Sequence, residues 1–279
     1  MLNVSIVLFH PMWEQNVLPL VKELQRARCV RKIALIDNSE QSSQLLFDKQ
    51  IFQDSSEVSY LFTGTNLGYG RAHNISLRES IQDEVEYHLV LNDDILLLAE
   101  DLDRIHAFME SHPDVGCLMP RVFSPNGEEQ YLAKLLPAPL DLFGRRFLPA
   151  GLMRRRNARF ELRNLDHNLP IDAPYLSGCF MFLRTRAAEE AGLFDERYFL
   201  YPEDIDLTRT IHRHYRTLYW PRVTIVHDHR RASYHSWRMT WVHIRNLCRY
   251  FGKWGWLFDR ERRLYNHQTI RQVQGIDKQ

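Results

Sequence analysis

Residues 88–94 read HLVLNDD, a β-prone apolar run that ends in three polar side chains. Three earlier apolar runs, at 4–9 (VSIVLF), 33–36 (IALI) and 58–62 (VSYLF), have the length of buried strands, and apolar residues at helical spacing follow the first of them. Strands and helices in alternation predict a mostly parallel sheet covered by helices, the doubly wound α/β class. In such sheets ligands bind at the carboxyl ends of the strands.

Each of the four runs is followed by polar or glycine residues. They are His10-Pro11, Asp37-Asn38-Ser39, the stretch 63–70 (TGTNLGYG) and Asn92-Asp93-Asp94. Any one of them is also ordinary turn chemistry, because Asn, Asp, Gly and Ser end strands in any case. Four in succession at one expected edge favour a ligand site.

Composition limits the class of protein. The chain has 279 residues with 36 Lys+Arg against 35 Asp+Glu, so its net charge of +1 makes a dedicated nucleic-acid binder an unattractive hypothesis. The four cysteines are too far apart for a zinc or redox pair, and we interpret them as reduced core residues of a cytoplasmic protein. The first residues lack a basic leader and no apolar stretch has membrane-spanning length, which indicates a soluble or peripheral protein.

The neutral total conceals a basic, aromatic second half. Seven arginines and one acid lie between Phe143 and Arg163, and nine Lys/Arg lie with several aromatic residues between Arg230 and Arg263. We interpret 137–149 (PAPLDLFGRRFLP) as a long loop because its prolines are spaced and its periodicity is poor. Segment 236–263 has three interpretations: a helix packed on the domain through Trp241, Ile244, Leu247, Cys248 and Phe251, a membrane-surface helix, or a dimer contact.

Three clusters carry candidate chemistry. Adjacent carboxylates in Asn92-Asp93-Asp94 are costly if buried without a cation, although a solvated turn also explains them. Residues 201–206 (YPEDID) open a helix, where acids complement the dipole; since neighbours diverge on a helix, at least one carboxylate of 203–206 should face the cleft as a general base. His227 and His229 share a strand face, which is moderately suggestive of a metal or phosphate contact.

Taken together, these segments resemble family 2 glycosyltransferases of the GT-A fold, and among them the bacterial rhamnosyltransferase-like enzymes of O-antigen and surface-polysaccharide synthesis. The matching segments are VSIVLFHP at 4–11, IDNS at 36–39, NLGYGRAHN at 66–74, LNDDI at 91–95, 176–211 (LSGCFMFLRTRAAEEAGLFDERYFLYPEDIDLTRTI) and PRVTIVHDHRRAS at 221–233. The resemblance implies a catalytic domain over 1–233, which leaves 234–279 as a basic, aromatic helical extension.

The resemblance also implies roles for individual residues. Asp204, in the pair with Glu203, would be the catalytic base, and Asp94 with His227 would bind a Mg²⁺ or Mn²⁺ ion. Donor binding would fall to Phe9, His10, Asp37, Asn66, Gly68, Gly70, Arg71, Asn74, Asp93, Ser177 and Gly178.

The expected activity is inverting transfer of a sugar, with dTDP-L-rhamnose as the leading donor, to a saccharide or polyprenyl-diphosphate-linked acceptor. The alternatives are a UDP-hexose or UDP-N-acetylhexosamine transferase of the same family, or a non-catalytic nucleotide-sugar-binding protein. A nucleotidyltransferase would want a glycine-rich phosphate loop near the N-terminus, which 10–13 (HPMW) does not provide. Contact with the inner face of the plasma membrane and a homodimer are further expectations.

Overall fold

The computed structural model describes residues 1–48, 57–228 and 237–273. Its strands are β1 Leu2–Leu8, β2 Val30–Asp37, β3 Val58–Phe62, β4 Tyr87–Asn92, β5 Ile95–Leu96, β6 Val115–Phe123, β7 Ala133–Lys134, β8 Ile171–Asp172, β9 Tyr175–Leu176, β10 Phe180–Arg184 and β11 Arg216–His227. Its helices are α1 Leu18–Arg26, α2 Gln44–Asp48, α3 Tyr69–Gln82, α4 Ala99–Ser111, α5 Pro139–Phe147, α6 Ala150–Phe160, α7 Thr185–Glu190, α8 Glu203–Ile211, α9 Trp237–Trp254 and α10 Arg260–Val273, with a π-helical turn, η1, at Trp13–Val17.

One large sheet organises the described chain, in the order β3-β2-β1-β4-β10-β6-β11-β5, with β8 paired to β11. The pairs among β3, β2, β1 and β4 are parallel, as expected, so the carboxyl ends of these four strands lie at one edge. β10 runs antiparallel to both β4 and β6, which makes the sheet mixed rather than uniformly parallel. Apolar runs identify strands but do not encode their direction, so this reversal is invisible in the sequence pattern.

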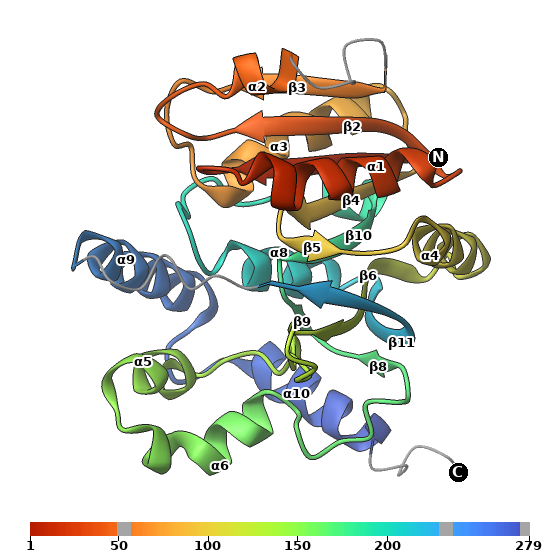
Figure 1. The fold of residues 1–279 in the computed structure, drawn as a ribbon. Helices are drawn as coiled ribbons and strands as arrows, with labels where there is room; N and C mark the ends of the chain where they lie inside the picture. Colours follow the sequence, from red (N-terminus) through yellow and green to blue (C-terminus); the bar gives the residue numbers. More distant parts are fainter. Residues whose placement is uncertain (49–56, 229–236, 274–279) are drawn as a thin grey trace.

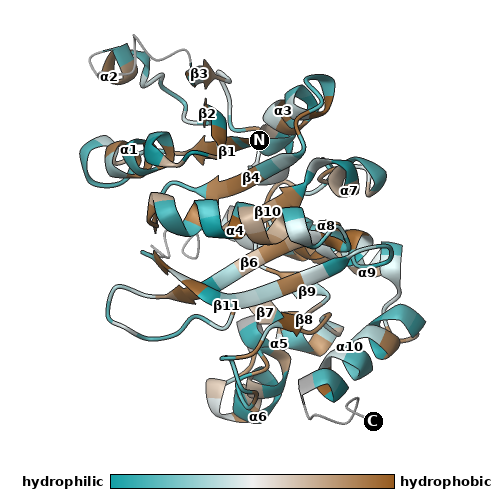
Figure 2. Cartoon of the chain, turned by 90° about the vertical axis from the view of Figure 1, so that its right-hand side faces the viewer, coloured by the Kyte–Doolittle hydropathy of each residue, from teal (hydrophilic) through white to brown (hydrophobic). Residues whose placement is uncertain are grey.

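Helices cover both faces of the sheet (Figure 1). Helices α1 and α4 lie over one face, and α3, α7 and α8 lie over the other. Helices α5, α6 and α10 gather beyond the end of the sheet that carries β8. Figure 2 shows the hydrophobic residues concentrated in the strands, whereas α10 is largely hydrophilic. The hydrophobic core therefore consists of the side chains packed between the sheet and its covering helices. Helices α5, α6 and α10 form a peripheral layer.

The expected loop at 137–149 is wrong, because Pro139–Phe147 forms α5. Pro139 opens the helix, where a missing N–H costs nothing, and the Asp141 carboxylate accepts a 2.6 Å hydrogen bond from the Ala138 N–H. Asp141 also pairs with Arg156 of α6 at 2.5 Å. The prolines thus mark helix boundaries, and the ion pair that secures the helix joins residues fifteen positions apart, beyond the reach of local periodicity.

The cysteine prediction holds for three positions and fails at the fourth. Cys29, Cys117 and Cys179 are buried and form no disulfide, whereas Cys248 is exposed on α9. The buried face of α9 instead carries residues at 243, 246, 247, 250 and 251, while Trp241 is 64% exposed. The helix does pack on the domain. Its buried face is rotated from the predicted one, since it includes the polar residues His243 and Asn246, which a pattern of apolar residues does not mark.

Candidate functional site

The ends of the parallel strands meet as expected. The Asn38 N–H donates to the Leu8 carbonyl, and the His10 N–H donates to Ser39 Oγ, so the ends of β1 and β2 are hydrogen-bonded beyond the ladder. Phe9 and His10 are exposed at this edge, and their rings lie 4.4 Å apart. The side chains of these two residues are therefore accessible at this edge, where His10 Nε2 also lies 2.9 Å from Glu40 Oε2.

Asp37 has no exposed surface and holds the loop after β2. Its oxygens accept from the Ser39 N–H (2.9 Å), the Ser43 N–H (3.1 Å) and the Tyr60 hydroxyl (2.5 Å). Burial raises the pKa of this carboxyl, but the hydrogen bonds from Ser39, Tyr60 and Ser43 outweigh burial and lower it overall. Asp37 is thus an ionised anchor behind the edge.

A turn at Gly68 links β2 to the start of α3. Asn66 Oδ1 accepts from the Gly68 N–H at 2.9 Å, and Asn38 Nδ2 donates to the Gly68 carbonyl at 3.0 Å. Gly68 has φ +86°, and a Cβ there would lie 2.2 Å from the Phe199 carbonyl oxygen. Glycine is required at position 68 because the backbone of Phe199, in the segment before α8, comes close to it. The turn therefore brings together two segments that are distant in sequence.

The next predicted donor residues also face protein. A Cβ at Gly70 would lie 2.7 Å from Phe194 Cβ, and the Asn74 amide exchanges hydrogen bonds with the Phe194 backbone at 2.9 and 3.1 Å. Arg71 Nε lies 3.6 Å from Glu196 Oε2. In this conformation Gly70 and Asn74 lock α3 onto the loop before α8, and Glu196 neutralises part of the charge of the exposed Arg71.

Tyr69 connects the two sides of the site. Its hydroxyl donates to the Gly178 carbonyl at 2.6 Å and lies 3.0 Å from Asn92 Oδ1. Burial, and then the charges of Cys179, Glu203, Asp204 and Asp94, raise its pKa well above the usual value. Tyr69 therefore stays protonated and ties the end of β4 to the β9–β10 loop, in which Ser177 is half-buried and Gly178 buried.

Asp94 and His227 come together at the opposite side of Asn92, with Asp94 Oδ1 3.3 Å from His227 Nε2. Gln130 orients the imidazole, because its Oε1 lies 2.9 Å from His227 Nδ1 and its Nε2 donates to the His227 carbonyl at 2.9 Å. Burial lowers the pKa of His227, but Cys179 and Asp94 raise it to about 10 overall. Asp93 is half-buried beside the pair, and His229 lies outside the described residues.

This arrangement fits a divalent cation with few protein ligands. Asp94 Oδ1 is buried without a hydrogen-bond partner among the described residues, and Gln130 leaves His227 Nε2 directed at it. A bound cation would replace the proton that Asp94 stabilises on His227. Within the described ranges no group of three His, Cys, Asp or Glu side chains is placed to hold a metal, so remaining ligands would have to come from water and substrate oxygens.

Glu203 and Asp204 are buried at the start of α8. Asp204 Oδ2 accepts from the Gly178 N–H at 3.0 Å and the Tyr175 hydroxyl at 3.3 Å, and its Oδ1 accepts from the Ile205 N–H at 2.8 Å. Burial raises the pKa of both carboxyls; the charge of Asp204 raises that of Glu203 further, whereas the bonds to Asp204 and nearby Lys134 oppose its own shift. Of the two carboxyls, Glu203 has the more strongly raised pKa, because the charge of Asp204 adds to burial there, whereas the hydrogen bonds to Asp204 oppose its shift.

Asp206, the third acid of the cluster, has a structural role. Lys253 Nζ donates to its Oδ2 at 2.6 Å and Trp254 Nε1 to its Oδ1 at 2.5 Å. Both partners belong to α9, so Asp206 fastens the C-terminal helices to α8. Of the three acids, Asp204 is the one whose contacts lead to the Gly178 loop.

Several residues of the site were given no individual role from the sequence. They are Asn38, Tyr69, Gln130, Lys134 and Tyr175. Tyr69 lies within the quoted NLGYGRAHN segment, and Tyr175 lies beside the quoted 176–211 segment, so their positions were available as a signal. Gln130 and Lys134 lie in a stretch without pattern, and only the fold brings them to the site.

Comparison with known proteins identifies the class. Residues 6–192 match the sequence profile of Glycosyl transferase family 2, two thirds of the chain, and the protein belongs to this family. The chain is similar to the N-acetylglucosaminyl-diphospho-decaprenol L-rhamnosyltransferase of Mycobacterium tuberculosis (29% identity over 181 residues, 61% of this chain and 58% of the relative). It is also similar to the rhamnosyltransferase WbbL of Escherichia coli K12 (26% identity, 80% of this chain and 82% of the relative).

The fold has solved counterparts. The structure of GalNAc-T7 with UDP, GalNAc and Mn²⁺ superposes with a TM-score of 0.65 at 15% identity, covering 91% of this chain and 48% of that one. The GT-A fold predicted from the resemblance is thereby confirmed. The chain spans about 58% of the length of the mycobacterial relative.

Proposed function

We propose that the protein is an inverting glycosyltransferase that moves a sugar from a nucleotide-sugar donor to a hydroxyl of a saccharide or polyprenyl-diphosphate-linked acceptor. The observation that carries this proposal is the buried pair Glu203–Asp204, in which Asp204 Oδ2 accepts from the Gly178 N–H at 3.0 Å and from the Tyr175 hydroxyl at 3.3 Å. The mycobacterial relative acts, by its name, on a diphospho-decaprenol, and both relatives are rhamnosyltransferases. The leading donor is therefore dTDP-L-rhamnose.

Asp204 is the proposed base. It takes the proton of the acceptor hydroxyl as that oxygen bonds to the anomeric carbon, while the bond from this carbon to the diphosphate breaks on the opposite face and the configuration inverts. Tyr175 and the Gly178 N–H orient the carboxylate. Burial and the charge of Asp204 raise the pKa of Glu203 well above its usual value, so we assign the shared proton of the resting pair to Glu203 and the role of base to Asp204.

The leaving side of the site is proposed at Asn92, Asp94 and His227. A divalent cation held by Asp94 and His227 would, when bound, neutralise charge on the departing diphosphate. The exposed Phe9 and His10 would face the nucleotide, and Asp37, Gly68 and Asn74 support that edge from behind. Arg71 is exposed and lies 3.6 Å from Glu196, and we assign it to exchange this carboxylate for a donor phosphate.

Replacement of the two carboxylates separately tests the assignment. Asp204→Asn should lower the transfer rate by about 10²- to 10⁴-fold, the usual contribution of a positioned base, and leave donor binding intact. Glu203→Gln imitates the protonated form proposed for Glu203 and should lower transfer far less. Rates by nucleotide release and donor affinity by calorimetry would be compared; equal losses in the two variants would contradict the division of roles.

A thermal-shift panel identifies the donor. The wild-type chain is heated with dTDP-, UDP- and GDP-sugars, each with and without Mn²⁺ or Mg²⁺. Stabilisation by dTDP-rhamnose above the others supports rhamnosyl transfer, and preference for a UDP-sugar selects the alternative transferase. Donor binding without any transfer to acceptor would instead indicate a nucleotide-sugar-binding protein.

We further propose that the C-terminal helices touch an anionic membrane surface. In the described chain no helix is both long and apolar enough to span a bilayer. Leu257 and Phe258 are 72% and 84% exposed between α9 and α10, and Trp237 and Trp241 are exposed on α9. Exposed aromatic residues near Lys/Arg suit lipid headgroups. Phe258→Glu should reduce co-sedimentation with anionic liposomes, and dimerisation through the same face would instead appear as a shift in sedimentation velocity.

A further inference from the structure

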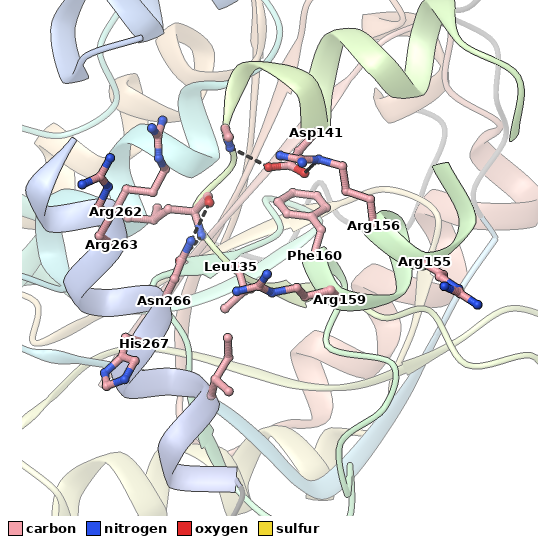
Figure 3. Close-up of a pocket in the computed structure, with 13 residues that line it drawn as sticks. Leu135, Asp141, Arg155, Arg156, Arg159, Phe160, Arg262, Arg263, Asn266 and His267 are labelled. Atoms are coloured by element: carbon pink, nitrogen blue, oxygen red, sulfur yellow. Dashed lines mark hydrogen bonds and ion pairs between the residues drawn. The ribbon is translucent and has the colours of Figure 1, made fainter. Parts of the chain in front are cut away.

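A cavity of about 610 Å³ lies between α6 and α10, apart from the carboxylates of the site (Figure 3). Helix α6 contributes Arg155, Arg156 and Arg159 to one side, and α10 contributes Arg263 and His267 to the other. These arginines come from the two basic segments at 143–163 and 230–263, and Arg159 and Arg263 lie 104 positions apart in the sequence. The fold brings them to one hollow.

Some cationic side chains at this cavity are committed to protein partners. Arg156 pairs with Asp141 at 2.5 Å. Arg262 is buried and donates to the Pro137 carbonyl at 3.3 Å and to two carbonyls of the α9–α10 connection. These two residues build the walls.

Three other guanidinium groups have no such partner. Arg155, Arg159 and Arg263 are exposed and make no ion pair or side-chain hydrogen bond within the described chain. Asp141, the acid that lines the cavity, is already paired with Arg156, so the repulsion among these three like charges would be relieved by a bound anion. Phosphate groups match guanidinium geometry and charge.

The rest of the cavity is apolar. Leu135, Leu136 and Phe160 are almost fully buried in its wall, and Ile270 adds a half-buried side chain from α10. Asn266 keeps this wall in place, because its amide exchanges hydrogen bonds with the Leu136 backbone at 2.7 and 2.9 Å. A cationic rim over an apolar floor suits a ligand with phosphate at one end and hydrocarbon at the other.

The cavity wall is continuous with the proposed base. The Leu135 N–H donates to the Phe160 carbonyl at 3.0 Å, and the Phe160 and Tyr175 rings lie 6.4 Å apart. Tyr175 in turn hydrogen-bonds Asp204. Phe160 of the cavity wall is therefore linked through Tyr175 to Asp204, the proposed base for the acceptor hydroxyl.

We propose that this cavity binds the phosphate groups and the first hydrocarbon units of a lipid-linked acceptor, with Arg159 and Arg263 on the phosphates and Leu135, Phe160 and Ile270 on the chain. The identification of the ligand as the sugar acceptor rests on the proposed function. The binding site itself is independent of donor and of turnover.

The test is calorimetric binding of farnesyl diphosphate, below its micelle concentration, to the full chain. The double variant R159A/R263A should bind at least about tenfold more weakly, because charge-assisted hydrogen bonds are lost. The matched control R154A/R260A removes two exposed arginines of the same helices that do not line the cavity, and should bind as the wild type does. Inorganic diphosphate and farnesol, offered alone, should both bind much more weakly than farnesyl diphosphate.

Equal weakening in both double variants, or in neither, would overturn the site. Inorganic diphosphate binding as tightly as farnesyl diphosphate would overturn the lipid part and leave a simple phosphate site. Ile270→Glu, which places an acid among the arginines, should lower farnesyl diphosphate affinity as well and serves if the first variant is poorly folded. If farnesyl diphosphate binds but no nucleotide-sugar stabilises the chain, the proposed function alone is refuted. If a nucleotide-sugar stabilises the chain but farnesyl diphosphate does not bind, the cavity proposal alone is refuted.

Discussion

A buried chain of hydrogen bonds under β1 predicts how stability depends on pH. Ser80 Oγ donates to the Ser76 carbonyl, so it must accept from His88 Nδ1, which lies 2.8 Å away. His88 Nε2 is then the acceptor for the Ser5 hydroxyl at 2.8 Å, and Ser5 Oγ accepts from His73 Nδ1 at 2.7 Å. This order of donors works only while His88 is neutral.

Burial lowers the pKa of His88 from 6.5 to about 3, and burial together with the charge of His88 lowers that of His73. A base whose folded pKa is depressed is protonated first in the unfolded state, so unfolding takes up protons and stability falls as pH falls from 6.5 toward 3. For His88 alone, lowering the pH from 7 to 5 should remove about 2 kcal/mol from the free energy of unfolding.

Urea titrations at pH 7 and pH 5, followed by tryptophan fluorescence, measure this loss. His88→Gln keeps an amide near Ser5 and Ser80 but does not titrate, so its stability should fall by about 2 kcal/mol less than that of the wild type over the same interval. His214→Gln, at an exposed position, is the control for removal of an imidazole. A wild type and a His88→Gln variant with the same pH dependence would refute the reasoning.

Two further substitutions test contacts that hold the site in place. Asp259→Asn leaves the Arg209 guanidinium, 1% exposed and paired with Asp259 at 2.6 Å, without its main anion, and should destabilise by about 3–5 kcal/mol in urea titrations; a loss below 1 kcal/mol would mean that Glu261 replaces the partner. Gly68→Ala combines a positive φ with a clash against Phe199 and should destabilise by more than about 1 kcal/mol, whereas Gly64→Ala, with positive φ and open space, reports the conformational part alone. Equal effects at the two glycines would refute the close approach.

Local pattern was sufficient for much of the fold. The runs at 4–9, 33–36, 58–62 and 88–91 are strands β1 to β4, and their polar ends meet at one edge because the strands are parallel. The reversal of β10 and the helix at 139–147 were missed, since both depend on partners distant in sequence. Periodicity also misplaced the buried face of α9.

The residues of the candidate site were likewise predicted only in part. Asp94 with His227, and Asp204 with Gly178, are brought together, although they are separated by many residues in the sequence. Asn74 was given a donor role by resemblance, yet its amide is occupied by the Phe194 backbone. A sequence motif indicates which residues occur together at a kind of site. It does not distinguish a residue that contacts the ligand from one that holds a ligand-binding loop in position.

The bonds from α9 and from the α9–α10 connection to α8 limit how this protein can change in evolution. Arg209 needs Asp259, and Asp206 needs Lys253 and Trp254, so each of these residues can be exchanged only together with its partner. A C-terminal segment grafted from another relative would place an uncompensated charge within a few residues of Asp204 unless it carried matching groups. Helix α8 and the C-terminal helices are therefore expected to share one ancestry.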